Sequence, residues 1–135
     1  MQFKRPENSD KYYWTRHSIG KMMQYGLSAQ RITRVIKGRK RIEEGVAENT
    51  IAVMQPTSTR RDEKGNLKWN QEIWVMYQKR KKDEKSKVKN KNGEIKSVLN
   101  KKNQLKIISA WKFPGMSPKN NPIPKEILEE LEDIL

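Results

Sequence analysis

A histidine and a lysine four residues after it are the side chains of this sequence best suited to chemistry. His17 is the only histidine among the 135 residues, and histidine is the side chain whose ordinary pKa lies closest to neutral pH. Residues four apart share one face of a helix, so Lys21 would stand beside it. Such a pair suits RNA cleavage without a metal. That reaction needs a proton acceptor for the ribose 2′-hydroxyl, a proton donor for the leaving oxygen and a cation near the phosphorus.

Two more residues complete the predicted catalytic group. Arg16 adjoins His17 in sequence but points to another side of the helix, and Ser109 lies in an apolar segment with strand-like alternation. The alternatives are structural: a lone histidine often caps or packs a helix start, and a serine among apolar residues is often a small filler. The predicted catalytic residues are His17, Lys21, Arg16 and Ser109.

Cationic and aromatic side chains form a predicted nucleic-acid surface. Its residues are Arg31, Arg34, Arg39, Lys40, Arg41, Trp111 and Lys112. The arginines and Lys40 would form a basic ridge that binds phosphate, or only a solvated face. Trp111 could stack on a base, or belong to the core.

Positive charge is concentrated in one segment. The chain has a formal net charge of +14, and residues 79–103 hold eleven cationic and three acidic side chains, which is +8 of that total. This balance indicates a polyanionic partner, most often nucleic acid. The segment would track phosphates as an arm, or be a mobile insertion kept solvated by self-repulsion.

Composition excludes several kinds of site. Without cysteine there is no disulfide framework or thiolate metal site, and one histidine rules out a multi-histidine site. A carboxylate metal site would have no spacing motif behind it. There is no long apolar run and no phosphate-loop, dinucleotide or serine-nucleophile motif. We expect no metal, no cofactor, no membrane contact and a cytoplasmic location.

The elements that must position these residues follow from periodicity. Two helices are predicted at about 16–25 and 29–37, with Thr15 and Ser28 as N-caps and Gly26 in a left-handed helix end. Alternating residues predict strands at 41–46, 50–55, 69–77 and 105–113, and Tyr12 and Trp14 could add a short edge strand. Asn92 and Gly93 are a hairpin signal that could extend a ribbon from the sheet.

The predicted fold is therefore a single α+β domain spanning residues 1–135. Two N-terminal helices pack on a roughly four-stranded antiparallel sheet, with the lysine-rich insertion at about 79–103 and an acidic C-terminal helix at about 124–135.

Three short runs resemble the opening of a small bacterial domain family of unknown function: Trp14-Thr15-Arg16-His17, Lys21-Met22 and Gly26-Leu27-Ser28. That family is grouped with the BrnT and RelE toxins in the barnase–EndoU–colicin–RelE fold. The segments starting at Glu72 and Ile107 are similar to the paired central strands of that fold. The resemblance implies a metal-independent ribonuclease in which His17 and Lys21 occupy the polar positions of the first helix.

These observations lead to one functional prediction and two alternatives. The prediction is a RelE/BrnT-like ribonuclease, with RNA as substrate and an acidic antitoxin as a possible protein partner. His17 would be its acid or base, and Lys21 with one or more of Arg16, Arg39 and Arg41 would stabilise the phosphorane. The first alternative is a non-catalytic nucleic-acid-binding module. The second is a regulator that acts on a protein through its acidic helix.

Overall fold

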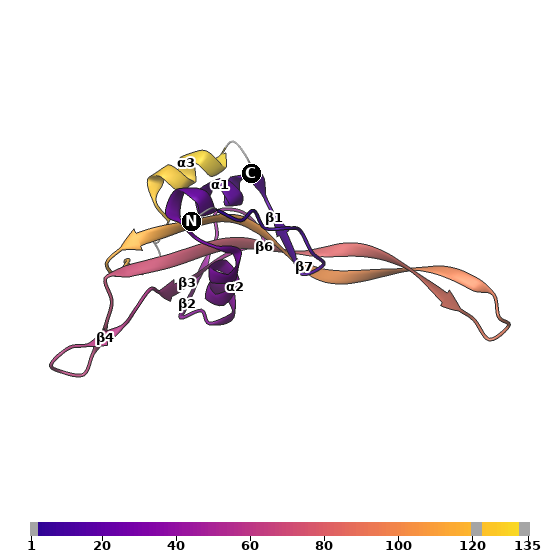
Figure 1. The fold of residues 1–135 in the computed structure, drawn as a ribbon, viewed down its shortest axis with the longest axis horizontal. Coiled ribbons are helices and arrows are strands. Elements are labelled where there is room, and N and C mark those ends of the chain that lie inside the picture. Colours follow the sequence, from indigo (N-terminus) through magenta and orange to yellow (C-terminus); the bar gives the residue numbers. More distant parts are fainter. Residues whose placement is uncertain (1–2, 120–122, 133–135) are drawn as a thin grey trace.

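The computed structural model describes residues 3–119 and 123–132, and for residues 83–86 and 98–101 it describes the backbone alone. Strands dominate an α+β architecture (Figure 1). In chain order the elements are β1 (Tyr12–Trp14), α1 (Arg16–Tyr25), α2 (Ala29–Lys37), β2 (Arg41–Glu44), β3 (Thr50–Pro56), β4 (Arg60–Arg61), β5 (Leu67–Lys68), β6 (Gln71–Lys89), β7 (Ile95–Pro114) and α3 (Lys125–Glu132).

The central sheet has five strands in the order β1-β7-β6-β3-β2, and β4 pairs with β5 in a separate small sheet. Strand β1 runs parallel to β7, while the other neighbours in the central sheet are antiparallel. The prediction of a roughly four-stranded antiparallel sheet was therefore wrong. A three-residue strand has too little alternation to reveal its partner, and β1 finds its place only by pairing Trp14 with the distant Ile107.

The helix ends match the local chemistry of the sequence. The Thr15 side chain accepts a hydrogen bond from the backbone N–H of Ser18, and the Ser28 side chain accepts one from that of Arg31. Gly26 ends α1 with φ 67°, the left-handed conformation that a residue without a Cβ adopts most easily.

Two apolar cores lie on opposite faces of the sheet. One contains Ile32 and Val35 of α2 packed with Val53 and Val75, and the other contains Ile127 of α3 among the tryptophans of the sheet. Figure 1 shows α2 below the sheet and α3 above it. The predicted arrangement of two N-terminal helices packed on a roughly four-stranded sheet, plus a C-terminal helix, was thus also wrong, because helices cover both faces of a five-stranded sheet. Because β6 alternates apolar residues on both faces, each face needs a cover of its own.

Helix α1 lies along β7 and joins the two layers. Thr15, at its start, donates its hydroxyl to the backbone carbonyl of Ile107 at 2.7 Å. Ile19 and Met22 belong to the core that contains Ile32 and Val35 of α2. Tyr25 packs against both cores. This arrangement turns the other side of α1, with His17 and Lys21, toward α3.

Strands β6 and β7 continue beyond the sheet as a long two-stranded ribbon. The pairing runs without interruption from Lys79 with Leu105 to Lys89 with Ile95, and a turn closes it with Gly93 at φ 80°. Figure 1 shows this ribbon twisting and projecting far from the body. The lysine-rich residues 79–103 are therefore strand and turn, as the Asn92-Gly93 signal suggested.

Among the helices of residues 3–119 and 123–132, none is long and apolar enough to cross a membrane.

Candidate functional site

The structure brings three of the four predicted catalytic residues together between α1, β7 and α3. His17 Nε2 lies 3.1 Å from the hydroxyl of Ser109, a residue 92 positions away in the sequence. Lys21 stands one helical turn further along α1 on the same side. Ser109 is fully buried, and the side chain of His17 is only 13% exposed.

The acidic C-terminal helix covers this group. Lys21 Nζ donates hydrogen bonds to Glu130 Oε1 at 2.8 Å, Glu126 Oε1 at 3.4 Å and Gln24 Oε1 at 3.0 Å. Lys21 is 5% exposed. Its three donors are used by these contacts, so a phosphate could reach Lys21 only if α3 moved away.

The electrostatics of the cluster follow from burial and from Glu130. Burial lowers the pKa of His17. The carboxylate of Glu130 opposes that effect, and the nearby charge of Lys21 adds to it. Burial also works against a charged Lys21, but Glu130 and Glu126 outweigh it and raise the pKa of Lys21. Both shifts favour a neutral imidazole at His17 and a charged ammonium at Lys21.

One carboxylate oxygen in this cluster lacks a hydrogen bond. Glu130 Oε2 is buried and lies 3.6 Å from His17 Nε2, beyond hydrogen-bond distance, and the residues that the structure describes provide it with no donor. The hydrogen-bond partner of His17 Nε2 is instead the hydroxyl of Ser109, at 3.1 Å.

The predicted phosphorane-stabilising arginines lie outside this cluster. Arg16 is exposed on α1. Arg39 donates to the backbone carbonyl of Ile36 at 3.0 Å. Arg41 lies over the ring of Trp74 and binds Ser117 and Glu43, on the face of the sheet that α3 covers.

The residues of the predicted nucleic-acid surface also lie on different elements of the fold. Arg31 and Arg34 are neighbours on α2, where burial and the charge of Arg34 lower the pKa of Arg31. Lys40 lies with its Nζ 5.5 Å from the ring centre of Trp69. Lys112 is half-buried on β7. Arg41 lies on the face of the sheet opposite α2, so it does not continue a ridge from Arg31 and Arg34.

Trp111 is part of the core. It is fully buried and stacks on Trp74, with ring centres 6.0 Å apart and an angle of 6° between the rings. Both residues belong to the cluster that α3 covers. In this structure the ring is covered by protein, which corresponds to the core interpretation and not to base stacking.

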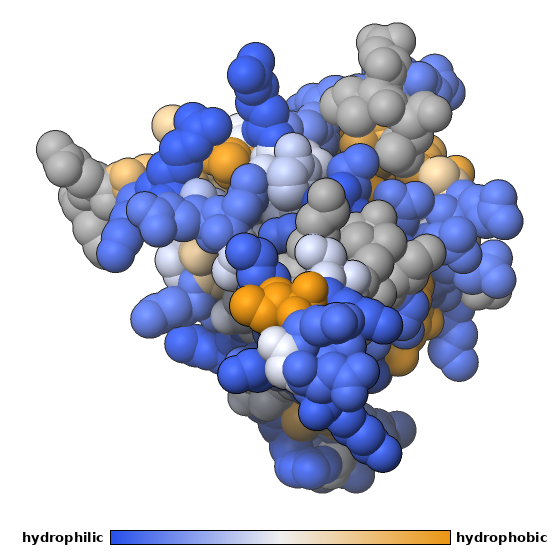
Figure 2. Space-filling model, turned by 90° about the vertical axis from the view of Figure 1, so that its right-hand side faces the viewer, coloured by the Kyte–Doolittle hydropathy of each residue, from blue (hydrophilic) through white to orange (hydrophobic). Residues whose placement is uncertain are grey.

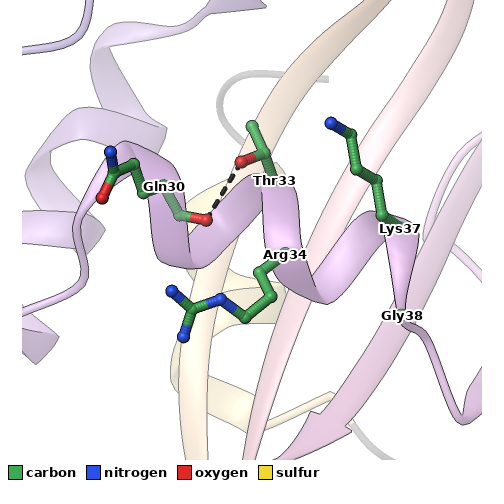
Figure 3. Close-up of a pocket in the computed structure, with 5 residues that line it drawn as sticks. All are labelled: Gln30, Thr33, Arg34, Lys37 and Gly38. Carbon is green, nitrogen blue, oxygen red and sulfur yellow. Dashed lines mark hydrogen bonds between the residues drawn. The ribbon is translucent and has the colours of Figure 1, made fainter.

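A shallow open groove runs along the solvent side of α2. Figure 3 shows the five residues that line it: Gln30, Thr33, Arg34, Lys37 and Gly38. The hydroxyl of Thr33 donates a hydrogen bond to the backbone carbonyl of Gln30. Arg34 and Lys37 are exposed, and they appear in none of the ion pairs of the described residues. The groove can attract a phosphate, but it has no enclosed shape that would select one.

The ribbon carries the largest concentration of exposed cations. Lys79, Lys81, Lys82, Lys87, Lys89, Lys91, Lys96 and Lys102 are all exposed. Cross-strand pairs share a face, so Lys81, Lys87 and Lys89 lie on one face and Lys82, Lys96 and Lys102 on the other. Cations therefore flank both faces of the ribbon.

The ribbon is fixed to the body by a polar network at its root. Gln104, which is buried, accepts a hydrogen bond from Arg80 Nε at 2.9 Å and donates to the backbone carbonyl of Ser9 at 2.8 Å. The Arg80 guanidinium also lies 4.4 Å from the ring centre of Tyr13. These contacts set the direction in which the arm leaves the sheet.

Sequence reasoning missed the partners of the charged residues. Glu126 and Glu130 belong to the predicted acidic helix, but nothing in their spacing ties them to Lys21. The opposite sign of that helix to the basic body was the one available signal for its docking. The buried carboxylate of Glu72 was also missed.

Comparison with protein-family models, with curated proteins and with solved structures gave no match. The resemblance to BrnT- and RelE-like toxins therefore stays a prediction. No group of three or more metal-ligating His, Asp or Glu side chains occurs among the described residues.

Proposed function

We propose that this protein is a nucleic-acid-binding module whose main contact surface is the β6–β7 ribbon. The observation that carries the proposal is the exposed lysine set on both faces of a projecting arm, within a segment of formal charge +8. Lysines on an extended ribbon neutralise phosphates and release counterions, which supplies affinity without sequence preference.

The experiment compares the salt dependence of binding for two variants of equal charge. The first replaces Lys87, Lys89, Lys91 and Lys96 on the ribbon by glutamine. The second replaces Lys4, Lys64, Lys119 and Lys125, which are exposed elsewhere. Binding to a fluorescent 20-base-pair DNA is measured by anisotropy over a series of salt concentrations.

The ribbon variant should bind more weakly, with a log K against log salt slope shallower by ~0.9 for each phosphate that the ribbon no longer neutralises. The second variant should keep a slope close to that of the parent. Equal losses of affinity in both variants would mean that net charge acts and the ribbon does not. Absence of binding by the parent would end the proposal.

A metal-independent ribonuclease remains a second candidate because His17, Lys21 and Ser109 meet in one cluster. With α3 in place, however, the cluster is covered and Lys21 is paired with carboxylates. Cleavage would therefore require α3 to leave, so that a phosphate could reach Lys21. RNA cleavage by the parent that is lost in His17→Ala, with binding retained, would favour this candidate over the first.

A further inference from the structure

We propose that the ribbon occupies the major groove of B-form duplex DNA, with the face that carries Ile95 on the groove floor and Ile95 contacting thymine methyl groups there. This inference rests on the proposed function and names its substrate class. It follows from the distribution of charge on the ribbon, its dimensions and the apolar side chains near its tip.

The charge distribution fits a groove better than a single backbone. A groove has a row of phosphates on each side, and a ribbon that lies with one face on the groove floor presents one strand to each row. The described ribbon meets that requirement, because Lys87 and Lys89 are exposed on β6 while Lys96 and Lys102 are exposed on β7. An arm that lay on one phosphate row would need cations on one strand only.

The dimensions favour B-form DNA over double-stranded RNA. The major groove of B-form DNA is about 12 Å wide and admits a two-stranded ribbon. Neighbouring strands lie about 4.8 Å apart, so two paired strands fit across a groove of that width and leave room for lysine side chains on each side. The major groove of an A-form RNA helix is deep and too narrow for side chains to read.

Two aliphatic side chains near the tip are left in water. Val88 is 48% exposed and Ile95 is 69% exposed. Val88 pairs with Lys96 and Ile95 pairs with Lys89, so the two lie on adjacent rungs and opposite faces and neither covers the other. Figure 2 looks onto the molecule from the side to which the ribbon projects and shows mainly hydrophilic side chains with small hydrophobic areas between them.

The major groove offers one apolar group that such side chains can contact. That group is the C5-methyl of thymine, which lies in the major groove beside the polar edges of the bases. The anchoring of Gln104 and Arg80 at the root presents the tip in a fixed direction, which lowers the entropy lost on binding.

The test is a double-mutant cycle that removes an apolar methyl group from the protein and from the DNA separately. The protein variant is Ile95→Thr, which keeps the β-branched shape and the charge. The DNA is an A·T-rich 20-base-pair duplex, used with thymine or with uracil in its place. Removing one buried methyl contact should weaken parent binding by about fourfold. The variant should bind both duplexes equally, with the salt slope of the parent.

Controls separate this inference from the proposed function. Ile42→Thr removes an aliphatic side chain that is 57% exposed on β2, away from the ribbon, and should keep the preference for thymine. Circular dichroism checks that each variant is folded. Equal sensitivity of parent and variant to uracil overturns the inference. So does equal binding of RNA duplex or single-stranded DNA of the same length. Both of these outcomes leave the lysine result unaffected.

Discussion

Lys21 Nζ lies 2.8 Å from Oε1 of Glu130, a residue 109 positions later in the chain, and this ion pair joins α1 to α3. The lysine is almost completely buried, and the contact raises its pKa against the effect of burial. The acidic helix is therefore held in place by charge as well as by the apolar contacts of Ile127 and Leu131.

Replacing Lys21 by methionine should destabilise the fold. Methionine keeps the apolar stem but removes the ammonium, so the carboxylate of Glu130 loses its partner at a site that is about one third exposed. We expect a loss of about 1–3 kcal/mol in the free energy of unfolding, measured with urea. Lys125→Met breaks only the exposed pair with Glu129 and should cost less than about 0.5 kcal/mol. Equal losses of stability in the two variants would contradict the role given to Lys21.

Stability should depend on pH through His17. Burial, with a smaller contribution from Lys21, lowers the pKa of His17 below its ordinary value of 6.5, despite the opposing charge of Glu130. Between the two pKa values the unfolded chain binds more protons than the folded protein, so stability rises with pH there. The stabilising contribution of the neutral His17 is complete above pH 6.5. It is lost as the pH falls below 6.5 and through the lowered pKa of His17 in the folded protein.

The measurement is urea unfolding of the parent and of His17→Gln at pH 5 and pH 7.5, a range chosen to span the ordinary pKa of histidine. Glutamine can still bond to Ser109 but does not titrate. The parent should lose more stability on acidification than the variant. An identical pH response in both would show that His17 has the same pKa in the folded and unfolded states.

Glu72 is a second buried ionisable group with a structural role. Its carboxylate, which is fully buried, accepts hydrogen bonds from Trp69 Nε1 at 2.8 Å, Trp74 Nε1 at 2.9 Å and the Ser117 hydroxyl at 2.5 Å. Burial alone would raise its pKa, but these hydrogen bonds lower it. The carboxylate therefore ties the segment at Ser117 to the sheet.

Glu72→Gln should cost roughly 2–4 kcal/mol, because the amide turns one of its donors toward groups that are themselves donors. Since the folded pKa lies below 4.5, the contribution of Glu72 is present above that pH and is lost as the pH falls below it. Urea unfolding at neutral pH should show the loss in Glu72→Gln and almost none in Glu48→Gln, whose side chain is exposed. A cost below about 0.5 kcal/mol for Glu72→Gln would mean that the network does not stabilise the fold.

Local structure could be predicted from the sequence because its causes are local. The ends of α1 and α2 follow from Thr15, Ser28 and Gly26, and each of these contacts lies within a few residues of its partner. The alternation in residues 69–77 likewise predicted a strand, which the structure shows as the first part of β6. The hairpin signal at Asn92 and Gly93 predicted the ribbon. The predicted strands, however, stopped at Tyr77 and began again at Leu105, whereas β6 and β7 continue through the ribbon.

What the sequence did not reveal depends on contacts between distant residues. The parallel pairing of Trp14 with Ile107 and the docking of α3 on Lys21 both join segments with no shared pattern. Arg41 lies apart from the other arginines of the predicted ridge for a similar reason. Adjacent residues on a strand point to opposite faces, and Arg41 is drawn to Ser117 and Trp74 on the face away from α2.

Gly20, inside α1, and Gly26, at its C-terminal end, offer a final test. Both positions have open space for a Cβ, and only their backbone conformations differ. A Cβ added at Gly20 or at Gly26 meets no atom within 4 Å, but Gly26 has φ 67° while Gly20 lies inside the helix. Gly20→Ala should stabilise the protein by about 0.5–1 kcal/mol, because alanine loses less backbone entropy in a helix. Gly26→Ala should destabilise it by about 1 kcal/mol, because a Cβ is strained in the left-handed region. Thermal unfolding should thus move in opposite directions for the two variants. A shift in the same direction for both would contradict a left-handed end to α1, on which the placement of α2 after Leu27 depends.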